Sequence, residues 1–267
     1  KINKSPIQGI SETLKIEYRT PSSLKNNKEE YNYLKELEAD IAIVVAYGQI
    51  IPKEYLNLVK KGFINIHASL LPKWRGAAPI QRSIMNLEKE TGVSIMKIQE
   101  KLDTGPICNS YKIEIMADDN SEVISEKLSA LAAEKILDNI DEILDGKIKF
   151  IEQKHNLASY AAKIEKTEGH IEWSETAENI IGKINGLYPS PGAFFTYNGE
   201  RYKILKASLA LGIGEIGEVL DNYLEISCGN KKSIKVLEIQ RQGKRSQNIG
   251  EFMLGSLIKK GSKLNNV

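Results

Sequence analysis

The first half of the chain alternates continuous apolar runs with amphipathic stretches. Residues 41–46 form an unbroken apolar run, which is typical of a strand buried on both faces of a parallel sheet. Residues 29–38 and 52–60 have helical spacing on either side of this run, and residues 63–67 form the next β-branched run. Helix, strand, helix and strand in this order predict right-handed crossovers and a parallel sheet.

The α/β pattern continues beyond these elements. We expect a short helix followed by two strands, at residues 80–87, 93–99 and 107–115. Residues 121–144 carry apolar side chains at a period of 3.6, so they predict a long amphipathic helix that ends near Gly146. Residues 1–28, by contrast, are polar and irregular, and we expect no regular element there.

The pattern changes in the second half of the chain. Residues 147–168 show little periodicity, and a helix over residues 176–187 is stopped by Pro189 and Pro191. Short β-like runs follow, at residues 194–197, 201–205, 217–220, 223–228 and 233–239. The first two runs flank Asn198-Gly199, which is a strong hairpin signal. Several short strands at regular spacing predict a small β-barrel or sandwich.

These patterns divide the chain into two domains. We expect an α/β domain over residues 1–150, a linker over 151–167 and a mainly β domain over 168–267. The composition, 41% hydrophobic and 27% charged over 267 residues, is that of an ordinary globular protein. No apolar run approaches the roughly 18–20 residues that span a bilayer, and the start does not resemble a signal peptide. We therefore expect no membrane association.

Cysteines and histidines are few and scattered. Cys108 and Cys228 are far apart in the sequence, which favours a reduced, cytoplasmic protein without disulfides. The three histidines form neither an HExxH pattern nor a cluster, so we expect no metal site.

Charge is distributed unevenly. The net charge is only +2, but residues 229–267 contain nine Lys or Arg against two Glu. A basic surface beside a near-neutral body suggests a polyanionic partner. A solvated lysine-rich surface without a partner explains the same charges equally well.

Two polar side chains end the apolar run at residues 63–67. Asn65 and His67 are two positions apart in a predicted strand, so they point to the same face at its carboxyl end. Asp103 follows the carboxyl end of the predicted strand at 93–99, and open α/β sheets bind ligands at that edge. Asp103 could fix the tautomer of His67, and Asn65 could stabilise an oxyanion. The spacing alone fits equally well a turn-forming Asn65, an ordinary partly buried His67 and a capping Asp103.

Several longer motifs carry a family resemblance. They are Asn65-x-His67-Ala68-Ser69-Leu70-Leu71-Pro72, Trp74-Arg75-Gly76-Ala77-Ala78-Pro79-Ile80-Gln81 and Leu102-Asp103-Thr104-Gly105, with Glu168-Gly169-His170-Ile171-Glu172-Trp173 in the second half. The chain resembles the 10-formyltetrahydrofolate-dependent formyltransferases, and within them the branch that acts on methionyl-tRNA. The resemblance covers nearly the whole chain. It implies a Rossmann-like parallel-sheet domain followed by a small OB-like β-barrel domain.

The resemblance implies a function and its residues. Formyl would pass from 10-formyltetrahydrofolate to the α-amino group of methionyl initiator tRNA for translation initiation, without a metal, in a cytoplasmic monomer. Asn65, His67 and Asp103 would be catalytic, with Asn65 and protonated His67 as oxyanion donors. The loop Ser69, Leu70, Leu71 and Pro72 would bind the folate co-substrate. The basic residues that would bind tRNA are Lys231, Lys232, Lys244 and Arg245.

Two other functions stay open on the sequence. One is a formyltransferase that acts on a small-molecule amine, such as a sugar amine or glycinamide ribonucleotide, although such enzymes need not carry the β domain in this form. The other is a nucleic-acid-binding module with an inactive α/β domain, against which the three intact candidate residues argue.

The beginning of the chain departs from the family pattern. Members of the family begin with another strand, a helix and a loop before the position of Lys1. The resemblance therefore implies that the sequence is a fragment or that upstream residues are not recorded. The first βα unit would belong to the sheet, its loop would contact the acceptor stem, and Lys1 and Lys4 would end that basic loop.

Overall fold

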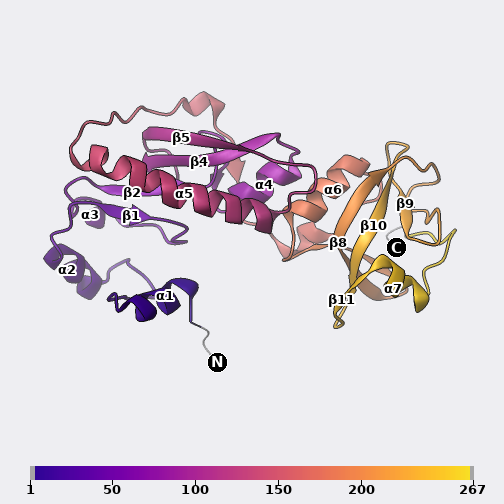
Figure 1. Ribbon diagram of the computed structural model, residues 1–267. Coiled ribbons are helices and arrows are strands. Elements are labelled where there is room, and N and C mark those ends of the chain that lie inside the picture. Colours follow the sequence, from indigo (N-terminus) through magenta and orange to yellow (C-terminus); the bar gives the residue numbers. More distant parts are fainter. Residues whose placement is uncertain (1–3, 265–267) are drawn as a thin grey trace.

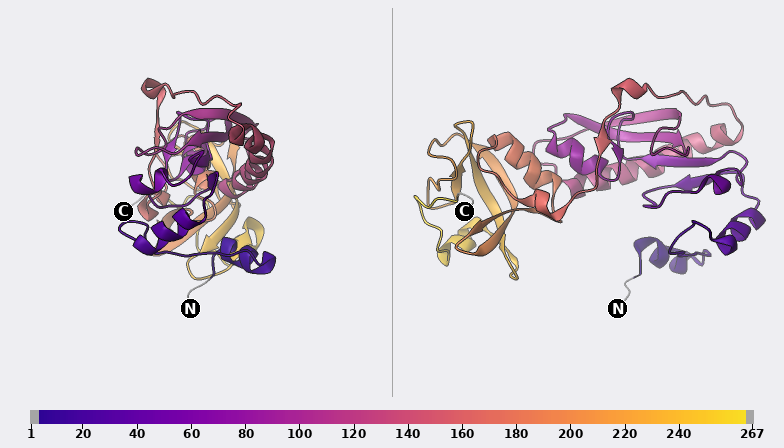
Figure 2. Two further views of the ribbon diagram at one scale, coloured as in Figure 1. Left: turned by 90° about the vertical axis from the view of Figure 1, so that its left-hand side faces the viewer. Right: turned by 180° about the vertical axis from the view of Figure 1, so that it is seen from behind.

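The computed structural model describes residues 4–264, so Lys1 lies outside the described residues. Two halves lie end to end in an elongated molecule (Figures 1 and 2). Among the described residues, no helix combines the length and apolarity that crossing a membrane requires.

A four-stranded sheet forms the first half, in the order β1-β2-β4-β5. Its strands are β1 (Ala42–Val44), β2 (Phe63–His67), β4 (Glu90–Lys97) and β5 (Ile107–Glu114). The expected parallel pairing holds for β1 and β2. It is wrong for β4, which runs antiparallel to β2, and β5 in turn runs antiparallel to β4. The helix between β2 and β4, α4 (Pro79–Met85), packs on α6 (Ala177–Gly186) of the second half, and its Ile84 also packs with Ile66 of β2 and Val93 of β4.

β1 is the edge strand of the described sheet, and the expectation that both of its faces are buried is wrong. Ile43 and Val45 are 39% and 58% exposed. The opposite face of β1 packs against α2 (Lys28–Glu36) and α3 (Lys53–Leu56) through a cluster centred on buried Tyr55.

The N-terminal stretch contains a helix that the sequence pattern did not predict. This helix, α1 (Pro6–Leu14), starts with a proline in its first turn, and the Ser5 hydroxyl accepts a hydrogen bond from the Gln8 amide. Its apolar side chains are exposed, including Ile7 at 73%, and the helix lies apart from the sheet (Figures 1 and 2).

The long predicted helix is confirmed as α5 (Ser121–Leu144), which lies across the sheet (Figure 1). The Asn120 side chain caps its first turn by accepting a hydrogen bond from the Val123 amide. Ile124 and Leu128 pack against residues of β2 and β4. This packing covers one face of the sheet whose strand ends form the candidate site.

A curled antiparallel sheet forms the second half, in agreement with the predicted OB-like β domain. Its strands are β7 (Ala193–Tyr197), β8 (Glu200–Ala210), β9 (Glu225–Ser227), β10 (Ser233–Arg241) and β11 (Ser246–Asn248). Asn198 and Gly199 close the predicted hairpin with φ of 51° and 76°. Residues 217–220 form only isolated bridges, so the strand expected there is absent. The core contains Trp173 and Phe195, and α6 and α7 (Ile249–Leu254) flank the sheet.

A connecting segment joins the halves and runs over the first one. It contains η1 (His155–Leu157), β6 (Tyr160–Ala161) and η2 (Lys166–Gly169). β6 pairs in parallel with the short strand β3 (Arg75–Gly76), and Ile151 exchanges backbone hydrogen bonds with Ile107. The connector is therefore part of the packed structure.

Candidate active site

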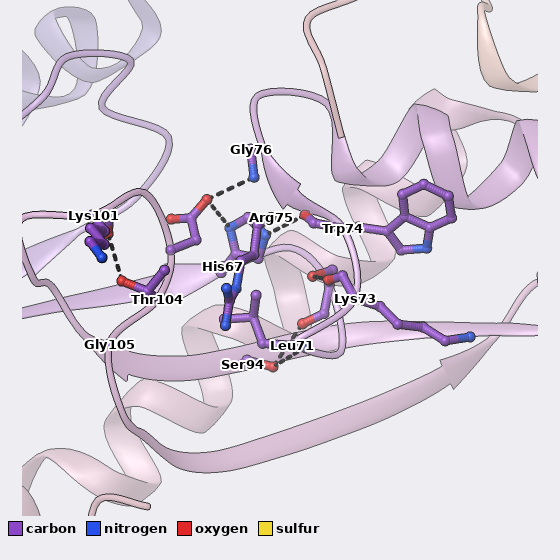
Figure 3. A network of polar contacts seen from close by, with 12 residues as sticks. His67, Leu71, Lys73, Trp74, Arg75, Gly76, Ser94, Lys101, Thr104 and Gly105 are labelled. Atoms are coloured by element: carbon purple, nitrogen blue, oxygen red, sulfur yellow. Dashed lines mark hydrogen bonds and ion pairs between the residues drawn. The ribbon is translucent and has the colours of Figure 1, made fainter. Parts of the chain in front are cut away.

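His67 ends β2 and is only 6% exposed. Its Nε2 lies 2.9 Å from the carbonyl oxygen of Trp74 (Figure 3). A carbonyl oxygen only accepts hydrogen bonds, so this contact places a hydrogen on Nε2. Trp74 has a φ of 62°, and this left-handed conformation belongs to the turn that presents its carbonyl to the imidazole. Asn65 is half-buried two positions earlier, where its backbone pairs with Val44 and Met96.

Asp103 lies next to His67, so the predicted proximity is confirmed. Its Oδ2 is 3.7 Å from His67 Nδ1, and the side chains are 13% and 7% exposed. The same oxygen accepts a hydrogen bond of 2.8 Å from the Gly76 amide (Figure 3). The route differs from the expectation, because the end of antiparallel β4 pairs Lys97 with Ile64 at the start of β2. The loop between β4 and β5 brings Asp103 back to the other end of β2.

The loop from Ser69 to Pro72 is built around a buried serine of β4. The Ser69 hydroxyl donates to the carbonyl of Lys73 at 2.6 Å. The Ser94 hydroxyl donates to the Ser69 carbonyl and accepts from the Leu71 amide. Ser69 and Leu71 are buried, whereas Leu70 and Pro72 are half-buried. Only the latter two keep appreciable surface for contact with a ligand.

A cavity of about 740 Å³ adjoins the Asp103 loop. The segment 98–101 and Thr104 form one wall, and Arg75, Lys53 and Leu56 line other parts of it. None of the residues Ser69, Leu70, Leu71 and Pro72 is in this lining. The volume lies within the usual range of about 300–1,000 Å³ for ligand pockets.

The candidate tRNA-binding residues occupy two separate places. Lys231 and Lys232 precede β10, whereas Lys244 and Arg245 lie in the turn that follows it. A strand of nine residues is about 30 Å long, so the four side chains do not form one cluster. Lys232 also forms an ion pair with Glu178 at the start of α6.

Metal binding finds no support in the described side chains. Within residues 4–264, no group of three or more His, Cys, Asp or Glu is arranged to hold a metal ion. Cys108 and Cys228 are free thiols in different halves, and burial raises the pKa of Cys228 to about 12.

Sequence reasoning missed the groups that hold the two central residues. The Trp74 carbonyl, the Gly76 amide and the side chains of Arg75 and Gln153 surround them. Arg75 and Gly76 belong to a motif recognised in the sequence, but nothing local to Gln153 marks it.

Fold and site together define a formyltransferase. A family model described as formyl transferase matches residues 2–140, and one described as formyl transferase, C-terminal domain, matches residues 163–257. The chain is 70% identical over 267 residues to the methionyl-tRNA formyltransferase of Pelagibacter ubique, covering 100% of this chain and 86% of that protein. It is 40% identical over 275 residues to that of Dictyoglomus turgidum, covering 100% and 87%. The chain belongs to the methionyl-tRNA formyltransferase family.

Solved structures share the fold at lower sequence identity. A sugar 3N-formyl transferase, WlaRD, has a TM-score of 0.69 and 24% identity over 91% of this chain and 83% of its own. An N-formyltransferase from Helicobacter canadensis has a TM-score of 0.69 and 22% identity over 88% and 82%. These likenesses support the fold of both halves.

Proposed function

We propose that this chain transfers the formyl group of 10-formyltetrahydrofolate to the α-amino group of methionine on initiator tRNA. The relatives at 70% and 40% identity are named for methionyl-tRNA. The observation that carries the proposal is the pairing of His67 with Asp103 at 3.7 Å beside a cavity of ligand size. The chain would act as a cytoplasmic monomer, and light scattering of the eluted protein tests the monomer.

The reaction needs an oxyanion donor and a route for one proton. The amine nitrogen attacks the formyl carbon, the new carbon–nitrogen bond forms, and the bond to the folate nitrogen breaks. Asn65 and His67 would donate hydrogen bonds to the tetrahedral oxyanion. Because Nε2 of His67 is engaged by Trp74, its Nδ1, which lies 3.7 Å from Asp103 Oδ2, is the nitrogen that would donate to the oxyanion. Asp103 would guide the proton from the amine to the folate nitrogen.

The folate co-substrate would lie against the loop from Ser69 to Pro72 and reach toward Asp103. Leu70 and Pro72 would supply apolar contacts, while buried Ser69 and Leu71 would shape the loop. The cavity beside Thr104 would take up part of the ligand, next to the loop that carries Asp103. Replacing Leu70 tests this contact through the Michaelis constant for the folate.

A small-molecule amine is the less favoured acceptor. The sugar enzyme WlaRD is 24% identical to this chain, against 70% for a relative named for methionyl-tRNA. The two acceptors are compared by supplying 10-formyltetrahydrofolate with either charged initiator tRNA or a free sugar amine. Formyl-methionyl-tRNA is the expected product. Turnover of the sugar amine alone would overturn the proposal, and tRNA binding without turnover of either acceptor would favour an inactive binding module.

His67→Ala tests the catalytic assignment. Loss of one oxyanion donor typically costs about 10²–10³ in rate, so we expect kcat to fall by that factor. His170→Ala is the matched control, because His170 lies in the second half and its Nδ1 contacts Glu172 at 3.0 Å. Full activity of His67→Ala in a single-turnover assay would disprove the mechanism.

A further inference from the structure

Gln153 is a buried polar residue in an otherwise exposed part of the connector. It is 7% exposed, whereas Glu152 and Lys154 on either side are exposed. From residue 151 to residue 157 it is the only buried side chain. Burying an amide is costly unless its hydrogen bonds are made, so its partners inside the protein matter.

The Gln153 amide makes every hydrogen bond that it can make. Nε2 donates to the carbonyls of Asp103 at 2.9 Å and Gly105 at 2.7 Å. Oε1 accepts from Arg75 Nε at 3.1 Å and from Arg75 Nη2 at 2.7 Å. An arginine only donates and a carbonyl only accepts, so the reversed orientation of the amide would lose all four bonds. The network therefore has one orientation.

This network holds the loop that carries Asp103. Asp103 has a φ of 49°, a left-handed backbone conformation that persists where surrounding contacts enforce it. Gln153 donates hydrogen bonds to the carbonyls of Asp103 and Gly105, on either side of Thr104. The Gly76 amide donates a hydrogen bond to the Asp103 carboxylate. Arg75 itself is only 2% exposed, and it precedes Gly76 in β3.

The anchors of the connector keep Gln153 in place. Ile151 is bonded to Ile107, and the Ser159 carbonyl accepts a hydrogen bond from the Arg75 amide. Gln153 lies between these two fixed points. We propose that Gln153, oriented by Arg75, is a positioning residue that sets the Asp103 carboxylate opposite His67. This inference rests on the proposed function, because it assigns Asp103 a part in formyl transfer.

Gln153→Glu removes the two donors while keeping an acceptor for Arg75. We expect kcat for methionyl-tRNA to fall about 10- to 100-fold, since displacing a reacting group by about 1 Å can cost that much. The Michaelis constants of both substrates should stay within about twofold, because Gln153 would touch neither substrate. Glu152→Gln, at the exposed neighbouring position, is the matched control and should leave kcat unchanged. An unchanged kcat in Gln153→Glu would overturn the inference.

A double-mutant cycle separates positioning from general loosening. In an Asp103→Ala background, Gln153→Glu should lower kcat by less than about threefold, because the carboxylate that it positions is gone. The same fold loss in both backgrounds would show that Gln153 does not act through Asp103. Should Gln153→Glu fail to fold, the smaller neutral variant Gln153→Ala enters the same cycle.

The Gly76 amide provides a readout that needs no activity. Its N–H donates to Asp103, so its proton resonance should move upfield in Gln153→Glu and stay in place in Glu152→Gln. An unmoved resonance would overturn the positioning role. If the unaltered chain formed no formyl-methionyl-tRNA, the proposed function would fail, whereas this resonance would still decide whether Gln153 positions Asp103.

Discussion

Two residues with side chains adopt left-handed backbone conformations around His67. Trp74 and Asp103 have φ of 62° and 49°. Each contacts a different nitrogen of the imidazole, Trp74 through its carbonyl and Asp103 through its carboxylate. Conformations of this kind cost free energy and persist at functional sites where surrounding contacts enforce them. For Asp103 the enforcing contacts come from the Gly76 amide and from Gln153, whereas the Trp74 amide donates a hydrogen bond to the Ser159 hydroxyl.

Gly105 tests how tightly the Asp103 loop is packed. A Cβ added at Gly105 would lie 1.9 Å from the Lys97 carbonyl oxygen, which belongs to the backbone of β4. We expect Gly105→Ala to lower the free energy of unfolding by about 2 kcal/mol or more and to reduce kcat. Chemical denaturation measures the first effect.

Gly9→Ala is the control for this substitution. Nothing lies within 4 Å of a Cβ added at Gly9, which is inside α1. The helix propensity of alanine should raise stability there by roughly 0.5–1 kcal/mol. Equal effects of the two substitutions would contradict the tight packing of the loop.

At the scale of elements, β10 separates the candidate tRNA contacts into two groups. Lys232 is paired with Glu178, whereas Lys244 and Arg245 lie in the turn after the strand. A lysine that is already neutralised by a carboxylate adds less to phosphate binding than an unpaired one. We therefore expect substitutions at the two ends of β10 to change tRNA affinity by different amounts.

We expect the double variant Lys244→Ala, Arg245→Ala to weaken tRNA binding and to flatten its salt dependence. The slope of log affinity against log salt should fall by about one for each phosphate that the variant no longer neutralises. Lys232→Ala is the comparison and should change the slope less. A larger change in Lys232→Ala, measured by filter binding over a salt series, would locate the tRNA-binding surface at the other end of β10.

The direction of β4 is also decided at this scale. Its apolar pattern predicts a strand but does not indicate whether that strand runs parallel or antiparallel to β2. The helix between the two strands, α4, packs closely on α6, because a Cβ added at Gly186 would lie 2.6 Å from Met85 Cγ. The chain then re-enters antiparallel to β2.

At the scale of the whole molecule, an ion pair joins the first half to the connecting segment that leads into the second half. Arg82 on α4 contacts Glu168 of η2 at 2.5 and 3.0 Å, and the side chains are 16% and 30% exposed. Arg82 also donates to the carbonyls of Ala162 and Lys163. The hydrogen bond from Arg82 lowers the pKa of Glu168 below its ordinary value of 4.5.

This contact predicts an acid-sensitive contribution to stability. A carboxylate whose pKa is lowered by folding stabilises the protein above its unfolded pKa, and the contribution is lost as the pH falls through the folded pKa. Glu168→Gln should lower the free energy of unfolding by about 1–2 kcal/mol at pH 7. The difference from the unaltered chain should shrink as the pH falls below 4.5.

Chemical denaturation of Glu168→Gln and of the unaltered chain at pH 7, 5 and 3.5 checks this prediction. The control is Glu134→Gln, because Glu134 is 65% exposed in its ion pair with Lys135 and should matter little. A difference between Glu168→Gln and the unaltered chain that is as large at pH 3.5 as at pH 7 would contradict the assigned cause.

The local sequence pattern was sufficient to predict most elements of the fold. The stripe of α5 and the Asn198-Gly199 hairpin depend on neighbours along the chain, so their bounds follow from periodicity and turn chemistry. Asn65, His67 and Asp103 were found through strand alternation and a family motif. The proximity of His67 and Asp103 was predicted correctly although the direction of β4 was not.

The sequence by itself determined that the first half is α/β and the second mainly β, that β2 ends in polar side chains, and that the chain belongs to a formyltransferase family. Only the tertiary structure decided what holds the site. Gln153 lies 50 residues from Asp103 along the chain, and Arg75 lies 78 residues from Gln153. No periodicity connects such positions, because they meet only after the connector has folded back over β3. Burial then makes their hydrogen bonds obligatory, and those bonds orient the carboxylate beside His67.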